Sequence, residues 1–194
     1  MCRAARRRCD IVTTTENDPP GALTLSSPRL ILIACSLSLA RSIVLDRARA
    51  EAQLGVTIPD DWPLPGLRGF VPFYIQMLAG DPAMLGWGMW LVVHAADRVV
   101  IGDVGFKGRT EGSDTVDIGY SIIPAYRNQG YASEAARTLI DWAFAQPGIE
   151  RVIATCLPSN VPSIRVLEKL GMRRAGTTES GMLAWSLSRS DRRR

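Results

Sequence analysis

The spacing of apolar residues divides this chain into stretches with the period of a strand and stretches with the period of a helix. Apolar runs bounded by turn residues predict strands at 24–34, 88–94, 98–107, 115–123, 151–157 and 182–187. Apolar positions three and four residues apart predict helices at 36–54, 67–79 and 131–144. The second helix is expected to break or to begin at Pro72. Prolines 59, 63 and 65 make the stretch between the first two helices a loop.

The order of these elements is typical of a mixed α/β domain. One strand and two helical stretches come first, a meander of three strands follows, and strand and helix then alternate. We expect a single domain over residues 23–188, preceded by a disordered leader at 1–22 and followed by a basic tail at 189–194. A misplaced start codon, which would add residues foreign to the native product, is an alternative origin for the leader.

The net charge of +4 comes from the two ends of the chain. Four arginines within residues 3–8 carry +4 and residues 189–194 carry +3, so the remainder of the chain carries −3. Arginine runs at chain ends are usually solvated tails. The charge distribution therefore predicts no basic face on the fold and no nucleic-acid partner. Nucleic-acid binding through the arginine-rich ends is the alternative, and it would show a steep salt dependence that is lost when both ends are removed.

The cysteines and the single histidine disfavour several classes of site. Cys2, Cys9, Cys35 and Cys156 form no C-x-x-C pair, and the last two have the surroundings of buried apolar residues. A single histidine, His94, excludes a multi-histidine metal site and disfavours a Ser-His-Asp hydrolase. We therefore expect no metal ion, and a structural role for His94.

The apolar stretch at 30–40 is similar in composition to the core of a signal peptide, because arginines precede it. Three prolines separate it from those arginines, and it is far shorter than the ~20 residues that span a bilayer. A buried strand that runs into a helix is the stronger interpretation. We expect a cytoplasmic protein with no membrane partner.

The main chemical signal is the segment YRNQGYASEA, from Tyr126 to Ala135, which joins a strand to an amphipathic helix. A short glycine-bearing turn before a helix presents free backbone N–H groups at the positive helix end, where a phosphate or pyrophosphate is favoured. Gly130 has no Cβ, so an anion can approach the backbone. The chain has neither G-x-x-x-x-G-K-[ST] nor a strand-linked G-x-G-x-x-G, the two familiar nucleotide loops. The alternative is an ordinary strand-to-helix turn.

Two motifs carry a resemblance to a known family. Arg127-x-x-Gly130-x-Ala132 resembles the [RQ]-x-x-G-x-[GA] loop of the GNAT superfamily of N-acetyltransferases. The segment NVPSIRVLEKLGM at 160–172 is similar to that family's N-x-x-[AS]-x-x-[VL]-x-E-K-x-G-[FM] helix, and LSSPRLIL at 25–32 resembles the opening of its ribosomal-protein N-terminal acetyltransferase branch. The resemblance covers roughly 24–188 and is specific over 115–172. It implies the acyl-CoA N-acyltransferase fold, an α/β fold with a mixed, mostly antiparallel sheet of six to seven strands flanked by about four helices.

The resemblance also implies where acetyl-coenzyme A binds. The loop residues expected at its phosphates are Arg127, Asn128, Gln129, Gly130, Tyr131, Ala132 and Ser133. A solvated loop charge is the alternative role for Arg127. The pantetheine arm would pair with the backbone of Ile122 and Ile123 and pass between two splayed strands. Asn160 would bond the pantetheine, cap the helix that follows it, or do both.

Acetyl transfer to an amine also needs a polarised thioester carbonyl and a base that takes a proton from the amine. By resemblance, a backbone N–H near Ile123 would polarise the carbonyl. Asp117 is the candidate base, with Glu111 and Asp114 as alternatives and an ion pair as the other role for its carboxylate.

Transfer further needs an acid for the departing thiolate. Many relatives have a tyrosine in the second motif where this chain has Leu167, so that role does not transfer. Ser163 occupies the small-residue position, and its hydroxyl is the candidate acid, with helix capping as the alternative. Cys156 lies within a predicted strand with no visible base, which favours direct transfer over an acetyl-cysteine.

These inferences predict an N-acetyltransferase that moves the acetyl group of acetyl-CoA to a primary amine of a protein or peptide N-terminus or of a small molecule. Six aromatic residues are expected to line the acceptor site or to belong to the core, about half of them in each role. They are Trp62, Phe70, Phe73, Tyr74, Trp87 and Trp90. The alternative is a coenzyme-A-binding regulatory or scaffold domain without turnover. A homodimer is left open.

Overall fold

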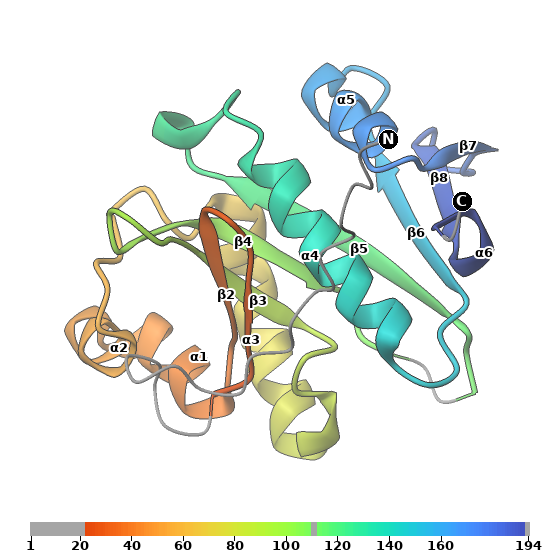
Figure 1. Ribbon diagram of the computed structural model, residues 1–194. Helices are drawn as coiled ribbons and strands as arrows, with labels where there is room; N and C mark the ends of the chain where they lie inside the picture. The colour runs from red at the N-terminus through yellow and green to blue at the C-terminus, as the bar shows by residue number, and fades with distance from the viewer. Residues whose placement is uncertain (1–21, 110–111, 193–194) are drawn as a thin grey trace, which may run out of the picture.

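The computed structural model describes residues 22–109 and 112–192 (Figure 1). Eight strands form one sheet in the order β1-β2-β3-β4-β5-β6-β8-β7. The strands are β1 (Thr24–Ser26), β2 (Leu30–Ala34), β3 (Met89–His94), β4 (Val99–Phe106), β5 (Thr115–Ile122), β6 (Arg151–Cys156), β7 (Arg173–Thr177) and β8 (Leu183–Ser188). The helices are α1 (Leu37–Leu45), α2 (Arg47–Leu54), α3 (Pro65–Gly80), α4 (Tyr131–Ala145), α5 (Val161–Lys169) and α6 (Arg189–Arg192), with 3-10 turns η1 (Pro82–Met84) and η2 (Pro124–Tyr126).

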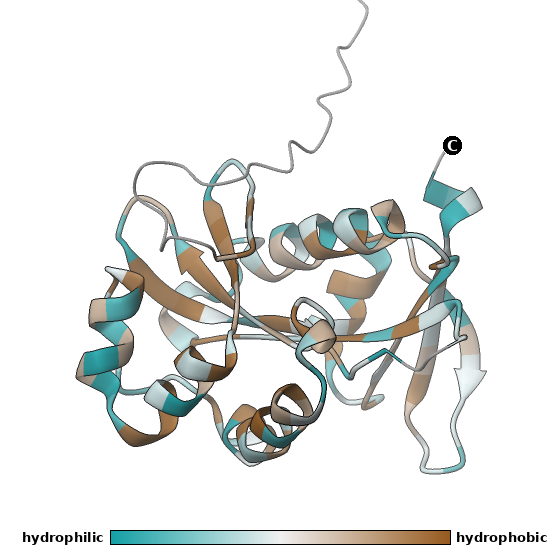
Figure 2. Cartoon of the chain, turned by 90° about the horizontal axis from the view of Figure 1, so that it is seen from below, coloured by the Kyte–Doolittle hydropathy of each residue, from teal (hydrophilic) through white to brown (hydrophobic). Residues whose placement is uncertain are grey.

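Helices cover both faces of the sheet. Helix α4 packs on β1, β2, β4 and β5, while α1 packs on α2 and α3 on the opposite side (Figures 1 and 2). Figure 2 shows that the strands between these layers are predominantly apolar. The core lies between the helices and the sheet. Leu139 and Ile140 of α4 and Leu91 and Ile101 of the strands belong to it, and all four have no exposed surface.

The expected α/β fold is confirmed, with one or two more strands than predicted. Strand β7 gave no signal in the sequence because every one of its residues is exposed, so it has no apolar alternation. The strand predicted over 24–34 is wrong as one element, since β1 and β2 form an antiparallel hairpin that pairs Leu25 with Leu32. Pro28 stands in the turn between them.

The helix predicted over 36–54 is also two elements. Asp46 has extended backbone, its N–H donates to the carbonyl of Ser42 at the end of α1, and its side chain accepts from the N–H of Arg49 in α2. One residue thus ends the first helix and caps the second. In contrast, α3 runs through Pro72 without a break, from Pro65 at its first turn. The expected break or start at Pro72 was wrong.

The two ends of the chain differ from the expected tails. The leader expectation falls on residues 1–21, outside the described part of the chain, and Ala22 packs against the core. The solvated tail is wrong for two arginines of α6. Arg189 Nε donates to the carbonyl of Ile149 at 2.8 Å, and Arg192 Nε donates to Asp141 Oδ1 at 2.8 Å. These contacts hold α6, which directly follows the last strand, against α4 and the loop after α4.

One irregularity of the sheet positions the site. All neighbouring strands are antiparallel except β5 and β6, which pair in parallel only from Thr115↔Arg151 to Asp117↔Ile153. Beyond that register the two strands diverge toward the end of the sheet where α5 lies (Figure 1). In the described part of the chain, the second half of β5 therefore has no strand partner on its β6 side.

Candidate active site

The loop before α4 has the backbone geometry of an anion site. Asn128 and Gly130 both have left-handed backbone, with φ of 61° and 85°. Gly130 is the N-cap of α4, and no side chain within residues 22–109 and 112–192 accepts a hydrogen bond from the first turn of that helix. The N–H groups of the first turn are thus left for a ligand, at the positive end of the helix dipole.

A polar clamp, formed by Ser27, Arg29 and Glu134, holds this loop against the β1–β2 turn. Glu134 accepts from Ser27 Oγ at 2.8 Å, from the N–H of Arg29 at 3.0 Å and from Arg29 Nε at 2.7 Å. Burial acts to raise the pKa of Glu134, but these hydrogen bonds outweigh it and hold the pKa below its ordinary value. Arg29 also donates to the carbonyl of Gln129 at 3.0 Å and lies 4.3 Å over the Tyr131 ring. A guanidinium therefore lies beside Gly130.

Arg127 supports the loop from the other side. Its Nε donates to the carbonyl of Ile122 at 2.8 Å, while the residue itself is exposed, so its remaining N–H groups are accessible. Gln129 donates from its side chain to the carbonyl of Ala125 at 3.3 Å. Ala132 and Ser133 lie half-buried in the first turn of α4.

The backbone of β5 corrects the expectation for Ile123. Its N–H donates to the carbonyl of Ile101, and its carbonyl accepts from the N–H of Tyr126, so both groups are used within the chain. Consecutive residues of a strand point their N–H groups to opposite edges. Since the N–H of Ile123 points to β4, the N–H groups of Tyr120 and Ile122 point to the β6 side, where an extended ligand could reach them.

A cavity of about 250 Å³, the inter-strand cavity, occupies the gap between β5 and β6. Its lining comprises Ile118, Gly119, Tyr120, Ala154, Thr155, Cys156, Leu157, Asn160, Ser163, Leu167 and Met182. Tyr120 Oη lies 3.0 Å from Ser163 Oγ, and burial raises the pKa of Tyr120 to about 12, so the phenol keeps its proton. Asn160 Oδ1 accepts from the N–H of Ser163 at 3.2 Å and thus caps α5.

Two of the residues predicted at the site, Asn160 and Ser163, line the inter-strand cavity, and the cap expected of Asn160 is confirmed. Tyr120 and Cys156, to which the sequence gave no catalytic role, line the same cavity. Tyr120 was missed because it stands on β5 rather than on α5, where relatives have their tyrosine. None of the described residues that line the cavity is a histidine or a carboxylate.

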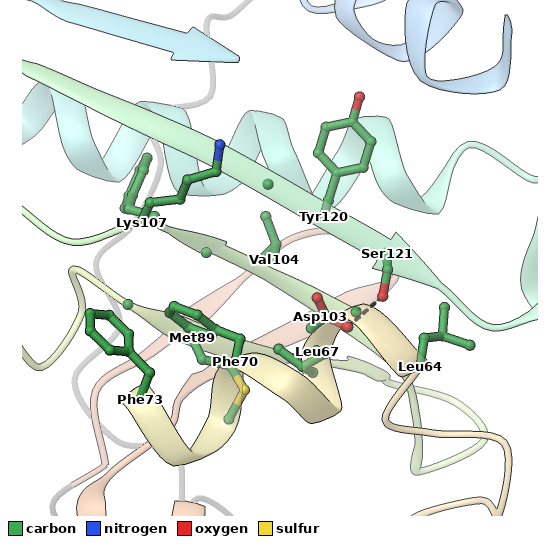
Figure 3. Close-up of a pocket in the computed structure, with 15 residues that line it drawn as sticks. Leu64, Leu67, Phe70, Phe73, Met89, Asp103, Val104, Lys107, Tyr120 and Ser121 are labelled. Atoms are coloured by element: carbon green, nitrogen blue, oxygen red, sulfur yellow. Dashed lines mark hydrogen bonds between the residues drawn. The ribbon is translucent and has the colours of Figure 1, made fainter. Parts of the chain in front are cut away.

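A second cavity of about 630 Å³, the apolar cavity, lies between α3 and the strands β3 to β5 (Figure 3). Its lining comprises Leu64, Gly66, Leu67, Phe70, Phe73, Gly88, Met89, Asp103, Val104, Gly105, Phe106, Lys107, Gly119, Tyr120 and Ser121. Gly119 and Tyr120 line both cavities, so the two meet at the middle of β5. A Cβ at Gly119 would have no atom within 4 Å, which shows that the strand is open at this point.

Asp103 on β4 is the carboxylate of the apolar cavity. Its Oδ1 accepts from Ser121 Oγ at 2.5 Å and from Trp62 Nε1 at 3.4 Å, as Figure 3 shows for the first bond. Burial raises the pKa of Asp103 to about 6, against the pull of these two hydrogen bonds. The pKa is thus close to the range in which a carboxylate exchanges protons at neutral pH.

The three carboxylates considered from the sequence lie elsewhere. Asp117 accepts from Lys107 Nζ at 2.6 Å and is not part of the lining of either cavity. Asp114 lies in the turn before β5 and accepts a hydrogen bond from the hydroxyl of Thr115, the first residue of that strand. Glu111 lies outside the described residues. The ion pair, the alternative role for Asp117, is therefore the role seen here.

Comparison with known proteins identifies the family. A family model described as an acetyltransferase (GNAT) domain matches residues 39–173, well over half of the chain. The chain belongs to the GNAT acetyltransferase family. An uncharacterised N-acetyltransferase of Bacillus subtilis strain 168, YjdG, is 28% identical over 147 residues, which cover 76% of this chain and 88% of that protein.

Solved structures confirm that this GNAT domain has the fold of the ribosomal-protein acetyltransferases. RimL, a ribosomal L7/L12 alpha-N-protein acetyltransferase, superposes with a TM-score of 0.62 at 18% identity, over 86% of this chain and 94% of that one. The microcin C7 self-immunity acetyltransferase MccE, solved with acetyl-CoA and AMP, superposes with a TM-score of 0.58 at 18% identity, over 84% and 93% of the two chains. At these identities the likeness concerns the fold.

The aromatic residues expected near the acceptor divide into two groups in this GNAT domain. Phe70 and Phe73 line the apolar cavity, and Trp62 donates to Asp103. The other three are core residues: Tyr74 donates to a buried backbone carbonyl, and Trp87 and Trp90 pack against Trp142 under α4.

The histidine has a structural setting. His94 lies between Tyr131 Oη, 3.0 Å from its Nε2, and Asp97 Oδ2, 2.9 Å from its Nδ1. These contacts tie the end of β3 to the start of α4. Within residues 22–109 and 112–192, no three metal-ligating side chains gather at one point, and no helix has the length and apolar character needed to cross a bilayer.

Proposed function

We propose that this chain transfers the acetyl group of acetyl-CoA directly to a primary amine. The observation that carries the proposal is the meeting of the two cavities on β5, where both are lined by Gly119 and Tyr120. The loop that leads to the uncapped start of α4 follows β5 in the chain, and Arg127 in that loop bonds back to the last residue of β5, Ile122. A coenzyme entering between the strands would bring its thioester to the wall of the apolar cavity.

The residues of the loop fit the phosphates of the coenzyme. The N–H groups from Gln129 to Ala132 would bind the pyrophosphate, with Asn128, Ser133 and the guanidinium groups of Arg29 and Arg127 as further donors. Left-handed backbone, seen here at Asn128 and Gly130, is typical of loops whose N–H groups bind an anion. Acetyl-CoA bound there would supply the acetyl group as an activated thioester.

The backbone of β5 would orient the arm of the coenzyme. The N–H groups of Tyr120 and Ile122 face the gap, and Asn160 lies at its far wall. A backbone N–H in this stretch is also suited to polarise the thioester carbonyl, because it is fixed by the sheet before any ligand arrives.

The hydroxyl pair of Tyr120 and Ser163 would donate the proton that the leaving sulfur needs. The two oxygens are 3.0 Å apart, and the raised pKa of Tyr120 keeps the pair protonated at neutral pH. Ser163 thus remains the candidate acid, with Tyr120 as its source of protons. Asp117 is held by Lys107, so the geometry favours Asp103 over Asp117 as the group that takes a proton from the amine.

A thiol-release assay tests the proposal. Acetyl-CoA is incubated with the protein and a panel of primary amines that includes peptides, small monoamines, polyamines and aminoglycosides, and acetylated product is measured by mass. We expect stoichiometric thiol and acetylated amine with at least one class. Calorimetric binding of acetyl-CoA without product across the whole panel would instead favour a regulatory or scaffold domain.

A further inference from the structure

The apolar cavity has a chemistry that selects among amines. Its walls are aliphatic and aromatic, with Leu67 and Phe70 on α3 facing Met89 and Val104 on the sheet (Figure 3). Among the residues that the structure describes in its lining, Asp103 and Lys107 are the charged ones. A ligand that fills this space must therefore be largely apolar and must satisfy a carboxylate at one point.

Asp103 has one oxygen available for that ligand. Both of its hydrogen bonds, from Ser121 and Trp62, are accepted by Oδ1. Among residues 22–109 and 112–192, no donor reaches Oδ2, and that atom is not among the fully buried ones. Ser121 and Trp62 thus fix the orientation of the carboxylate and leave Oδ2 for a charged donor such as an ammonium group.

Lys107 limits which cations the cavity accepts. Its ammonium group is paired with Asp117 at 2.6 Å, and its side chain is 59% exposed. The pair has no net charge, so the remaining anion of the cavity is the single carboxylate of Asp103. Among the described residues of the lining, a second ammonium group on the same ligand would meet no second unpaired carboxylate, and its burial against the apolar walls would be unfavourable.

We propose that the acceptor is a monoamine with an apolar or aromatic group close to its nitrogen, the ammonium group binding Asp103 Oδ2 and the apolar group packing on Leu67 and Phe70. This inference rests on the proposed acetyl transfer and names its substrate class. A peptide N-terminus with an apolar first side chain belongs to this class, whereas polyamines and aminoglycosides do not.

The chemistry balances with groups already described. The ammonium gives one proton to Asp103, and the free amine nitrogen then forms its bond to the acetyl carbon while the carbon–sulfur bond of acetyl-CoA breaks. The sulfur takes a proton from the pair formed by Ser163 and Tyr120. The new amide nitrogen loses its second proton, which restores that pair, and Asp103 releases its proton to solvent.

The first test compares three amines with the wild-type protein. The kcat/KM for acetylation is measured for 2-phenylethylamine, ethanolamine and spermidine. We expect 2-phenylethylamine to exceed the other two by at least about tenfold, the discrimination that one well-packed apolar group supports. Ethanolamine or spermidine acetylated as well as 2-phenylethylamine would overturn the inference while leaving the acetyltransferase proposal intact.

The second test uses variants with a matched control. Phe70→Ser should lower kcat/KM for 2-phenylethylamine about tenfold and leave ethanolamine within about twofold, because only the first amine uses the apolar wall. Leu45→Ser, at an exposed position on α1, is the control and should change neither value. Equal losses for both amines in Phe70→Ser would contradict a specificity role for the wall.

Binding measured without turnover separates the two proposals. Saturation-transfer NMR reports 2-phenylethylamine on the protein in the absence of coenzyme, and calorimetry reports acetyl-CoA. Amine binding that is lost in Asp103→Asn, with acetyl-CoA binding retained, supports the inference. Amine binding without any binding of acetyl-CoA would overturn the acetyl-transfer proposal but keep the amine site. No amine binding, with acetyl-CoA bound normally, would overturn the site.

Discussion

The two cavities that meet at Gly119 and Tyr120 are built from different parts of the chain. The inter-strand cavity and the loop before α4 present mainly backbone groups, held open by a register that stops at Asp117↔Ile153. The apolar cavity presents side chains from α3, β3, β4 and β5. Backbone groups suit a coenzyme that never changes, while side chains can be exchanged without loss of the fold. On the proposed function, we therefore expect acceptor specificity to depend on the apolar cavity.

The largest expected effect is on acetyl-CoA binding by the backbone groups of the loop before α4. Gly130→Glu should weaken acetyl-CoA binding more than about 100-fold, because it adds a side chain at φ 85° and a negative charge where phosphates bind. Calorimetry measures the dissociation constant. Gly130→Ala is the control: it strains the same backbone without charge and should cost far less affinity. Wild-type affinity in Gly130→Glu would remove the phosphate assignment.

Asp103→Asn tests the role of the side chains in the apolar cavity. Loss of the proton acceptor should lower kcat about 100-fold or more while acetyl-CoA affinity stays within about twofold. The wild-type kcat/KM should also fall on the acid side of about pH 6, where Asp103 becomes protonated, and the variant should lack this limb. A variant with normal turnover, or with an unchanged acid limb, would move the base to another group.

The same variant makes a prediction for stability. Because burial raises the pKa of Asp103 above its value of about 4 in the unfolded chain, the folded state loses stability as pH rises from about 4 to about 6. Asp103→Asn removes this cost and should gain about 2–3 kcal/mol of unfolding free energy at pH 8 and almost none at pH 4. Urea unfolding at the two pH values checks it. A gain independent of pH would contradict a raised pKa.

A smaller effect is expected where the two cavities meet. Ser163→Ala and Tyr120→Phe should each lower turnover about tenfold while acetyl-CoA affinity changes less, because each breaks one link between the hydroxyl pair and the leaving sulfur. If the two act as one relay, the double variant should lose no more than the worse single variant. Additive losses would show that the hydroxyls act separately, and unchanged turnover in Ser163→Ala would clear it of an acid role.

The smallest effect concerns the polar clamp. Glu134→Gln keeps the shape but removes the charge that Arg29 binds, and it should cost about 1–3 kcal/mol of stability and a few-fold in coenzyme affinity. The lowered pKa of Glu134 means that this stability is present at neutral pH and is lost as pH falls through the folded pKa. The difference in unfolding free energy between wild type and variant, measured with urea, should therefore narrow as the pH is lowered from 7 through the acid range. A stability difference that does not narrow as the pH falls would show that the charge is not what holds the clamp.

The same contrast explains what could be predicted from the sequence. The backbone side is encoded in contiguous motifs, so the loop at 127–132 and the cap at Asn160 are predictable from the order of residues alone. The apolar cavity has no motif, because Trp62, Asp103 and Ser121 meet only after a loop and two strands are brought together. The use of Ile123 was misjudged for a related reason, since which edge a strand amide faces depends on its register with β4.

The most direct test of the whole account is a crystal structure with acetyl-CoA bound. We expect the pyrophosphate on the N–H groups from Gln129 to Ala132 and the pantetheine arm between β5 and β6, paired with the backbone of Tyr120 and Ile122. The thioester should lie beside Gly119, at the wall of the apolar cavity. A coenzyme bound elsewhere, or a gap closed by pairing of β5 with β6 beyond Asp117↔Ile153, would contradict it.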